Sequence, residues 1–377
     1  MGQLRWSRTM GGKEQMNVLV TGGCGYIGLW VCRKLKEAGH NVSIVDKMFF
    51  PTGVNAVDEF VGDVETIYEY DLRDMPVNVL DGIDAVCHLG GLSNDPTAAF
   101  NPEANKEMNY IATENLANMV KHHDTARRII FASSASVYGF NTNSALTEES
   151  TINPQSEYAS SKYDAEREVL DMYDCNPDYC PTVFRQATVM GWSPRHRHDL
   201  VVNAMTKSAL VNKIITVNAG GEALRPLVDV QDVAEAYVRC LSMPYEKVAG
   251  EVFNLAHKRN AEFAHHEGYT IASLALWIKH IINERGYDVE VKGSWEGTEN
   301  RSYDMTCKRL RDTFGWSPAR GVASAVNSII EQYEAGNLKL EDHEANNIGW
   351  MEALDYGQKV SERTGGIFDE YKAHTEV

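Results

Sequence analysis

Short runs of β-branched and aliphatic residues alternate with longer segments of helical periodicity along the first half of the chain. Strands are predicted at residues 18–21, 41–45, 83–89, 128–133 and 182–185. Helices are predicted at residues 26–38, 102–122 and 157–172. Because short apolar strands that alternate with helices build a parallel sheet with right-handed crossovers, the pattern predicts a doubly wound α/β fold.

The alternation stops near Ser193, where shorter strands and irregular loops begin. We therefore expect the sheet domain to occupy residues 16–192, with some later segments returning to it, and a smaller substrate-binding region to occupy 193–330. Residues 1–15 lack an apolar core and are expected to form a disordered extension. Residues 331–377 hold enough apolar side chains to pack as helices against the substrate-binding region.

Charge and composition exclude several classes of protein. The 377 residues include 36 Lys and Arg against 53 Asp and Glu, a formal net charge of −17, which argues against nucleic-acid binding. No run of about 18 apolar residues exists to span a membrane. Seven cysteines without a C-x-x-C pair indicate a reducing compartment, so a cytoplasmic location is expected. His265, His266 and Glu267 are interpreted as a solvated loop, and no metal site is expected.

A glycine-rich loop at residues 21–28 lies between the first strand and the first helix. Gly22 permits a tight turn, Gly25 lets the backbone approach a diphosphate, and Gly28 lets the helix pack closely on the strand. Asp46 ends the second strand, where a carboxylate accepts hydrogen bonds from ribose hydroxyls and repels a 2′-phosphate. The sequence therefore favours bound NAD over NADP.

A tyrosine, a lysine and a serine form a candidate acid–base site. Tyr158 and Lys162 are four residues apart and share one face of the predicted helix, while Ser134 ends a predicted strand. A free tyrosine has a pKa near 10, so a catalytic phenol needs nearby positive charge to stabilise its phenolate. The ammonium of Lys162 is expected to supply part of that charge.

With these residues in place, the chain resembles the extended short-chain dehydrogenase/reductases, the NAD-dependent sugar-nucleotide epimerases and dehydratases. The resemblance covers about residues 16–322. It rests on the following motifs: TGGCGYIG at 21–28, Asp71-Leu72, HLGG at 88–91, Asn109, SSASVYG at 133–139, YASSK at 158–162, RPLVDVQDV at 225–233, Arg301 to Asp304, and FGWSP at 314–318.

The resemblance implies a Rossmann-type sheet with bound NAD, a nucleotide-diphosphate-sugar substrate and a homodimer built on the helices 102–122 and 157–172. It implies catalytic roles for Ser134, Tyr158 and Lys162. The cofactor-binding residues it implies are Gly22, Gly25, Tyr26, Ile27, Gly28, Asp46, Asp71, Leu72, Leu89, Gly90, Gly91, Asn109, Tyr158 and Lys162. The substrate-binding residues it implies are Ser93, Ser134, Ser136, Thr188, Arg225 and Arg301, the two arginines gripping the diphosphate.

The reaction expected from this resemblance is epimerisation at C4 of the sugar through a transient keto intermediate. A ketoreductase or decarboxylase acting on a nucleotide sugar, and a non-catalytic NAD-sensing or scaffold protein, stay open as alternatives. Dehydratases of the family carry an Asp-Glu pair where this chain has Ala135 and Ser136, so dehydration is not expected. The chain also departs from its relatives at Thr188, where Asn is common, and in the basic stretch 193–199.

Overall fold

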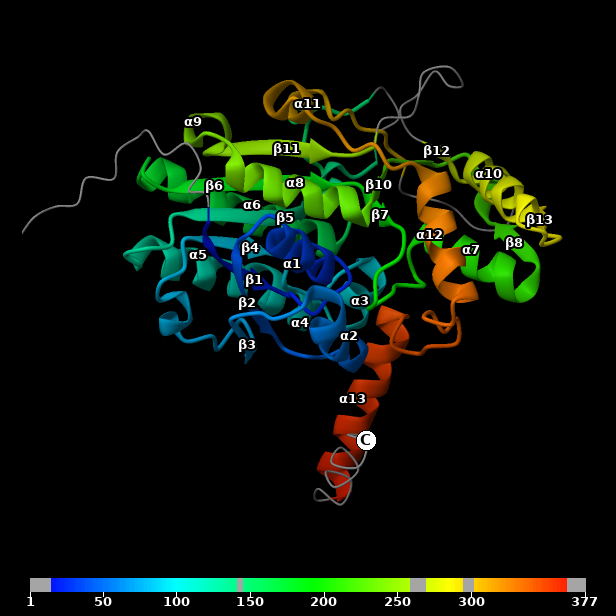
Figure 1. The fold of residues 1–377 in the computed structure, drawn as a ribbon, viewed down its shortest axis with the longest axis horizontal. Coiled ribbons are helices and arrows are strands. Elements are labelled where there is room, and N and C mark those ends of the chain that lie inside the picture. Colours follow the sequence, from blue (N-terminus) through cyan, green and yellow to red (C-terminus); the bar gives the residue numbers. More distant parts are fainter. Residues whose placement is uncertain (1–14, 141–144, 258–268, 294–301, 365–377) are drawn as a thin grey trace, which may run out of the picture.

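Seven parallel strands form the central sheet of the molecule, a computed structural model that describes residues 15–140, 145–257, 269–293 and 302–364. The strand order is β11-β6-β5-β4-β1-β2-β3 (Figure 1). The strands span Asn17–Thr21 (β1), Asn41–Asp46 (β2), Thr66–Glu69 (β3), Ala85–His88 (β4), Arg128–Ser134 (β5), Cys180–Gln186 (β6) and Glu251–Leu255 (β11). The predicted doubly wound fold is confirmed, and the chain adds β3 and β11, which the hydrophobic pattern did not single out.

Helices cover both faces of this sheet. On one face, Gly28–Glu37 (α1) packs beside Val230–Ser242 (α8), and both contribute to the larger hydrophobic core (Figure 1). On the other face, Ala112–His122 (α5) packs beside Glu157–Cys175 (α6). Because β11 and α8 come from beyond residue 193, the later part of the chain contributes to the sheet domain.

A second hydrophobic core lies beside the carboxyl ends of the strands. It is formed mainly by Val201–Asn212 (α7), Ile271–Glu284 (α10) and Val322–Glu334 (α12). Small strand pairs adjoin it: Ile214–Val217 (β8) with Glu290–Gly293 (β13), Thr188–Met190 (β7) with Leu227–Asp229 (β10), and Leu224–Arg225 (β9) with Tyr269–Thr270 (β12). This smaller region faces the edge at which a ligand of an open α/β sheet binds.

The remaining helical segments are short, apart from the last. They are Pro51–Ala56 (α2), Val57–Val61 (η1), Val77–Leu80 (η2), Asp95–Phe100 (α3), Pro102–Lys106 (α4), Glu107–Ile111 (η3), Ala135–Tyr138 (η4), Ala219–Gly221 (η5), Tyr245–Val248 (α9), Lys308–Phe314 (α11) and Asn347–Thr364 (α13). Leu338 and Leu340, ahead of α13, pack into the second core, whereas α13 itself begins against α3.

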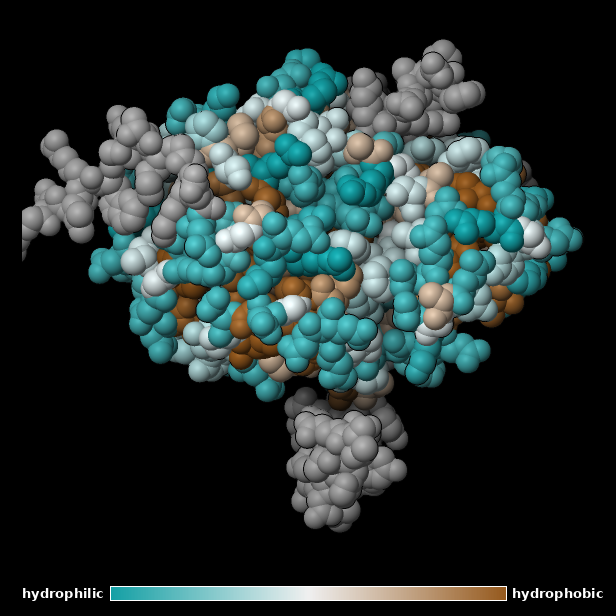
Figure 2. All heavy atoms as spheres, in the orientation of Figure 1, coloured by the Kyte–Doolittle hydropathy of each residue, from teal (hydrophilic) through white to brown (hydrophobic). Residues whose placement is uncertain are grey.

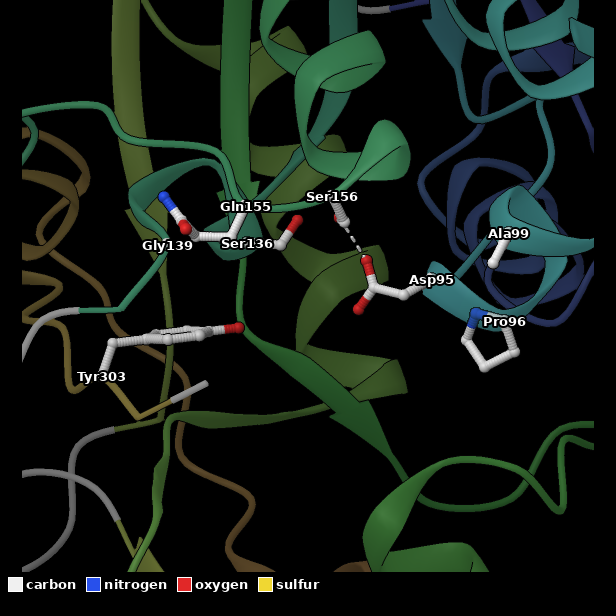
Figure 3. Close-up of a pocket in the computed structure, with 8 residues that line it drawn as sticks. All are labelled: Asp95, Pro96, Ala99, Ser136, Gly139, Gln155, Ser156 and Tyr303. Carbon is white, nitrogen blue, oxygen red and sulfur yellow. Dashed lines mark hydrogen bonds between the residues drawn. The ribbon is translucent and has the colours of Figure 1, made fainter. Parts of the chain in front are cut away.

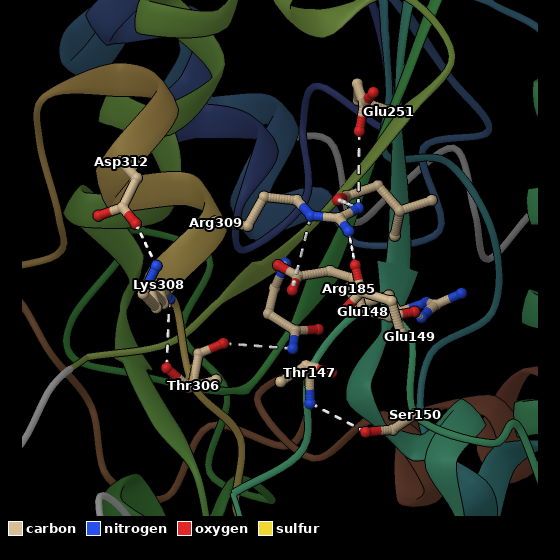
Figure 4. A network of polar contacts seen from close by, with 12 residues as sticks. Thr147, Glu148, Glu149, Ser150, Arg185, Glu251, Thr306, Lys308, Arg309 and Asp312 are labelled. Atoms are coloured by element: carbon tan, nitrogen blue, oxygen red, sulfur yellow. Dashed lines mark hydrogen bonds and ion pairs between the residues drawn. The ribbon is translucent and has the colours of Figure 1, made fainter.

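An ionic network fastens α11 to the edge of the sheet (Figure 4). Arg309 lies 3.9 Å from the carboxylate of Glu148 and 3.5 Å from that of Glu251 on β11, and it also pairs with Glu149. Glu148 is almost fully buried and accepts the backbone N–H of Asn254 at 2.8 Å. The network thus holds the loop that follows β5 against the last strand of the sheet.

The face of the molecule shown in Figure 2 is mostly hydrophilic. Within the described part of the chain, no helix combines the length and the apolar character needed to cross a membrane. Three sets of residues singled out in the sequence lie wholly or almost wholly outside the described residues: the N-terminal extension 1–15, the pair His265–His266 with Glu267, and Arg301.

Candidate active site

The glycine-rich loop forms a tight turn that other residues could not adopt without a clash. Gly22 has φ +70°, and its N–H donates to the carbonyl of Val45 at 2.7 Å. A Cβ on Gly22 would lie 2.9 Å from Cα of Gly90, and one on Gly28 would lie 2.1 Å from the carbonyl oxygen of Gly22. The loop therefore packs directly against the segment that follows β4 and places the N-terminus of α1 beside it.

Asp46 is held at the carboxyl end of β2, next to this loop. Its carboxylate accepts the N–H of Cys24 at 3.0 Å and that of Met48 at 2.8 Å. Burial raises the pKa of Asp46 above its ordinary value, while these backbone hydrogen bonds and the charge of Arg195 oppose the rise. Burial also raises the pKa of the Cys24 thiol to about 12, which leaves that cysteine unreactive at neutral pH.

The next wall of the site lies between β3 and β4. Asp71 is buried, and Arg73 donates to both of its carboxylate oxygens, at 3.0 Å and 2.8 Å, which lowers the pKa of Asp71. A Cβ on Gly90 would lie 2.5 Å from Cδ1 of Leu72, so the two residues are in close contact. The N–H of Leu89 donates to the carbonyl of Thr21 at 3.1 Å, which ties this wall to the glycine-rich loop.

Residues 102–122 do not form the single regular helix that the sequence predicts. Between α4 and α5, η3 makes one wider turn with i→i+5 geometry, a form that recurs at functional sites because it reorients side chains. Asn109 lies in this turn, fully buried, and donates to the carbonyl of Leu92 at 2.9 Å. Its Oδ1 has no hydrogen-bond partner among the described residues, and a Cβ on Gly91 would lie 2.3 Å from it.

Tyr26 and Ile27 directly precede α1. The buried hydroxyl of Tyr26 donates to the carbonyl of Gly191 at 2.7 Å, and Asn203 on α7 donates to that hydroxyl at 3.3 Å. The side chain of Tyr26 thus joins the glycine-rich loop to the second region.

The tyrosine, lysine and serine expected from the sequence come together at the carboxyl end of β5. Ser156 caps α6 by accepting the N–H of Ala159, so Tyr158 and Lys162 stand one turn apart on the helix. Ser134 lies beside Tyr158 and lowers the pKa of its phenol. The N–H and the hydroxyl of Ser136 both donate to Oγ of Ser134, at 3.2 Å and 2.9 Å, and these bonds fix the orientation of that hydroxyl.

Burial is the largest influence on the pKa values of Tyr158 and Lys162. It raises the pKa of Tyr158 to about 12, and the strongest opposing influence is the positive charge of Arg197, ahead of the influence of Ser134. Burial lowers the pKa of Lys162 to about 8, and its ammonium donates to the carbonyl of Ala132 at 3.1 Å. The sequence predicted that Lys162 would supply positive charge to Tyr158. In the structure, Arg197 contributes such a charge.

A buried ion pair beneath α6 anchors the helix that carries Tyr158. Arg185 on β6 donates through Nε at 3.1 Å and Nη2 at 2.5 Å to Glu166, one turn beyond Lys162. Ser133 on β5 donates to Glu166 at 2.8 Å, and Arg185 also donates to the hydroxyl of Tyr138 at 2.9 Å. The spacing of motifs in the sequence did not predict this ion pair, because Arg185 and Glu166 belong to different elements.

A pocket of about 330 Å³ opens in front of Ser136 (Figure 3). Asp95 on α3 supplies the one carboxylate among the eight described residues that line it, and its Oδ1 accepts the hydroxyl of Ser156 at 2.6 Å. The ring of Tyr303 forms the opposite wall, with its hydroxyl directed into the pocket. Asp95 and Tyr303 both raise the pKa of Tyr158, which places the pocket next to that tyrosine.

Most of the basic stretch 193–199 is buried, including both of its arginines and both of its histidines. Arg197 donates to both carboxylate oxygens of Asp199, at 2.9 Å and 2.6 Å, and to the hydroxyl of Ser93 at 3.1 Å. Asn94 donates to the same Asp199 at 2.6 Å. The sequence marks this stretch as unusually basic, but only the fold shows that Arg197 acts on Tyr158.

The other expected substrate residues lie farther along the same side. The N–H of Thr188, at the start of β7, donates to the carbonyl of Pro226 at 3.1 Å. Arg225 is buried, with its guanidinium 6.0 Å from the ring centre of Tyr303. Arg301 lies outside the described residues. The structure thus gathers two sets of residues, one around the glycine-rich loop and one around Tyr158.

The first set fits a dinucleotide. The carboxyl ends of β1, β2 and β4 meet where the strand order reverses, and ligands of doubly wound sheets bind at such a point. The cradle around Gly22 and Gly90 is too narrow for any Cβ, and Asn109 leaves a buried acceptor without a partner among the described residues. Within the described chain, no cluster of three or more His, Cys, Asp or Glu side chains is arranged to hold a metal ion.

Together, the glycine-rich loop and the Tyr158–Lys162 helix define a dinucleotide-dependent enzyme of the short-chain dehydrogenase/reductase class. Comparison with known proteins identifies the family. The sequence model of the NAD dependent epimerase/dehydratase family matches residues 18–256, and the chain belongs to this family, with NAD as its cofactor. The resemblance found in the sequence motifs is therefore confirmed.

Two curated relatives and one solved structure show the extent of the similarity. A putative UDP-glucose 4-epimerase of Methanocaldococcus jannaschii is 27% identical over 325 residues, covering 85% of this chain and 99% of that protein. UDP-glucuronic acid decarboxylase 1 of Danio rerio is 26% identical over 341 residues, covering 89% and 76%. The crystal structure of a UDP-glucuronic acid 4-epimerase from Bacillus cereus has a TM-score of 0.72 at 21% identity, covering 85% of this chain and 99% of that one.

Proposed function

We propose that the protein is an NAD-dependent epimerase that inverts C4 of a nucleotide-diphosphate sugar. The observation that carries this proposal is the placement of Ser134 beside Tyr158, where it lowers the pKa of the phenol, next to the pocket that Ser136 lines. The names of the curated relatives support a UDP sugar as the first substrate to test. The residues assigned to cofactor and substrate keep the roles expected from the sequence, and a cytoplasmic location belongs to the same proposal.

Each side chain has a separate role in the proposed reversible oxidation. Tyr158, in its phenolate form, takes the proton from the C4 hydroxyl, and Ser134 hydrogen-bonds the same oxygen so that the hydroxyl points at the phenolate. Arg197 supplies positive charge that stabilises the phenolate, and Lys162, one turn along the helix, is expected to add to it. Bound NAD would supply the hydride acceptor for C4 and the hydride donor for the opposite face of the turned keto sugar, and the glycine-rich loop and Asp46 would hold it. Tyr158 then gives the proton back to the new hydroxyl.

The charge of the pocket favours a neutral hexose over a sugar acid. Asp95 faces the space in front of Ser136, and a second carboxylate brought close to it would be repelled. This observation weighs against decarboxylation of a glucuronic acid, the reaction named for one of the relatives. Dehydration lacks support as well, because Ala135 is buried and has no ionisable group, and a serine hydroxyl at Ser136 is too weak an acid or base to replace a carboxylate.

Purified protein is expected to interconvert UDP-glucose and UDP-galactose without added cofactor, because epimerisation regenerates NAD in every cycle. The measurement is product analysis by chromatography over a panel of neutral and carboxylated nucleotide hexoses, after dialysis of the enzyme. Neutral sugars are expected to react more efficiently than UDP-glucuronic acid. Accumulation of 4-keto-6-deoxy products, or a strict need for stoichiometric reduced cofactor, would contradict the proposal.

The proposal includes a homodimer with a four-helix interface. The segment from α4 to α5 and the helix α6 pack side by side on one face of the sheet. The outer side of this pair bears partly exposed apolar residues, among them Met108, Tyr110 and Ile111. Light scattering is expected to give twice the mass of the chain, and Tyr110→Arg is expected to shift that mass toward the monomer. A monomer mass at every concentration would refute the dimer.

A further inference from the structure

The C-terminal segment 338–350 runs from the second core back to the cofactor side of the sheet. Leu338 and Leu340 pack in the second core. Glu344 accepts the N–H and the hydroxyl of Thr52 at 3.0 Å and 2.7 Å, and the indole N–H of Trp350 donates to the carbonyl of Phe49 at 2.6 Å. The segment is thus fastened to the loop that follows β2, at the edge where the dinucleotide site lies.

Asn347 is the residue of this segment that reaches farthest into the site. It is 6% exposed, accepts from Nη2 of Arg195 at 2.6 Å and donates to the hydroxyl of Ser93 at 2.8 Å. Ser93 follows β4, and Arg195 belongs to the basic stretch 193–199. One amide side chain from the end of the chain therefore joins two elements that are 102 positions apart in sequence.

Arg195 is placed to meet an anion. Its guanidinium is 2% exposed and stacks 3.6 Å above the ring centre of Phe50, and its Cβ borders Gly53 beside the glycine-rich loop. Its hydrogen bonds go to the neutral oxygens of Asn347 and of the Glu344 backbone, and its Nε has no acceptor within the described chain. The carboxylates of Asp199, Glu344 and Asp342 raise the pKa of Arg195, but within the described chain none of them accepts a hydrogen bond from its guanidinium. A bound anion such as a diphosphate would therefore stabilise this buried group further.

We propose that Asn347 is a positioning residue of the dinucleotide site: it holds Arg195 and Ser93 so that the guanidinium faces the diphosphate of NAD. The strand order reverses between β1 and β4, and Arg195, Phe50 and Ser93 all lie at the carboxyl ends of the strands around that point. The C-terminal extension is then part of the site. This proposal rests on NAD binding and is independent of the net reaction.

Asn347→Ala is expected to raise the dissociation rate of bound dinucleotide about tenfold, since it removes the buried hydrogen bond that holds Arg195 and the partly buried one that holds Ser93. The rate is measured on the full chain loaded with NADH, by the change in nicotinamide fluorescence after addition of excess NAD. His343→Ala, an exposed side chain of the same segment, is the matched control and is expected to leave the rate unchanged.

A double-mutant cycle separates positioning from a general loss of structure. If Asn347 acts through Arg195, Asn347→Ala is expected to add nothing to the dissociation rate in an Arg195→Gln background. Independent, multiplicative effects, an unchanged rate in Asn347→Ala alone, or slower dissociation would each overturn the proposal. Should Asn347→Ala not fold, as judged by its thermal melt, Asn347→Ser replaces it in the cycle. Because the dissociation assay contains no sugar substrate, its result can be interpreted even if the proposed epimerase activity is not found.

Discussion

Tyr158→Phe is expected to lower kcat by about a thousandfold, the middle of the range that a positioned acid–base group contributes. The change removes the phenol oxygen that exchanges a proton with the C4 hydroxyl and keeps the ring that packs at the start of α6. Bound NAD is expected to remain, since the glycine-rich loop and Asp46 are untouched. Initial rates of UDP-galactose formation, with dinucleotide content measured after denaturation, test both halves of this prediction.

Tyr163→Phe is the matched control for that experiment. Tyr163 lies one turn along the same helix, packs against the larger core and is partly buried. Its loss of a hydroxyl is expected to change kcat by less than about twofold. Equal activity of Tyr158→Phe and the wild type would remove Tyr158 from the mechanism. If the wild-type protein itself turns over no nucleotide sugar while holding NAD, the sensing or scaffold alternative gains support.

Lys162→Met is expected to reduce turnover and to stabilise the cofactor-free protein at the same time. Turnover is expected to fall by about a hundredfold, because the phenolate of Tyr158 loses a neighbouring positive charge. Stability is expected to rise because the ammonium is 6% exposed and its burial is costly, whereas a methionine of similar length fills the same space without a charge. The melting temperature should increase by a few degrees at pH 7.

The pH dependence of this stabilisation has a defined sign. Burial lowers the pKa of Lys162 from 10.5 to about 8, so between these values the unfolded chain binds more protons than the folded one. Stability of the wild type attributable to Lys162 therefore rises with pH across that window. The advantage of Lys162→Met should be greatest below pH 8 and should vanish by about pH 10.5. An advantage that is constant with pH would contradict the burial of a charged lysine.

If Lys162→Met stabilises the protein and greatly reduces turnover, the buried lysine serves catalysis and not stability. The ion pair of Glu166 and Arg185 anchors α6 to the sheet, and Ser156 caps the N-terminus of this helix. The position of Lys162 therefore does not depend on its own charge. Lys162→Met should therefore leave the helix in place. Its loss of turnover would then reflect electrostatics and not a displaced backbone.

The order of strands and helices could be predicted from the sequence because burial imposes a local period on each element. Strands buried on both faces appear as short apolar runs, and the helices that cover them as amphipathic segments, so the α/β class and most of the sheet follow from the hydrophobic pattern. The short edge strands β3 and β11 could not be identified in this way. The wider turn around Asn109 was also beyond the sequence, because its i→i+5 geometry is decided by packing against Gly91 and Leu92.

Functional motifs that lie within one segment could be predicted from the sequence. The glycine-rich loop and the Tyr158–Lys162 pair depend on spacing along a single turn or helix, and such spacing survives without knowledge of the fold. The charges that act on this group come from elsewhere: Arg197 and Asp95 reach Tyr158 only through tertiary structure. The same is true of Asn347, which meets Ser93 across 254 residues. The sequence by itself determined the fold class and the local acid–base motif, whereas the tertiary structure decided the electrostatic setting, because Coulombic forces depend on distance in space and not on separation along the chain.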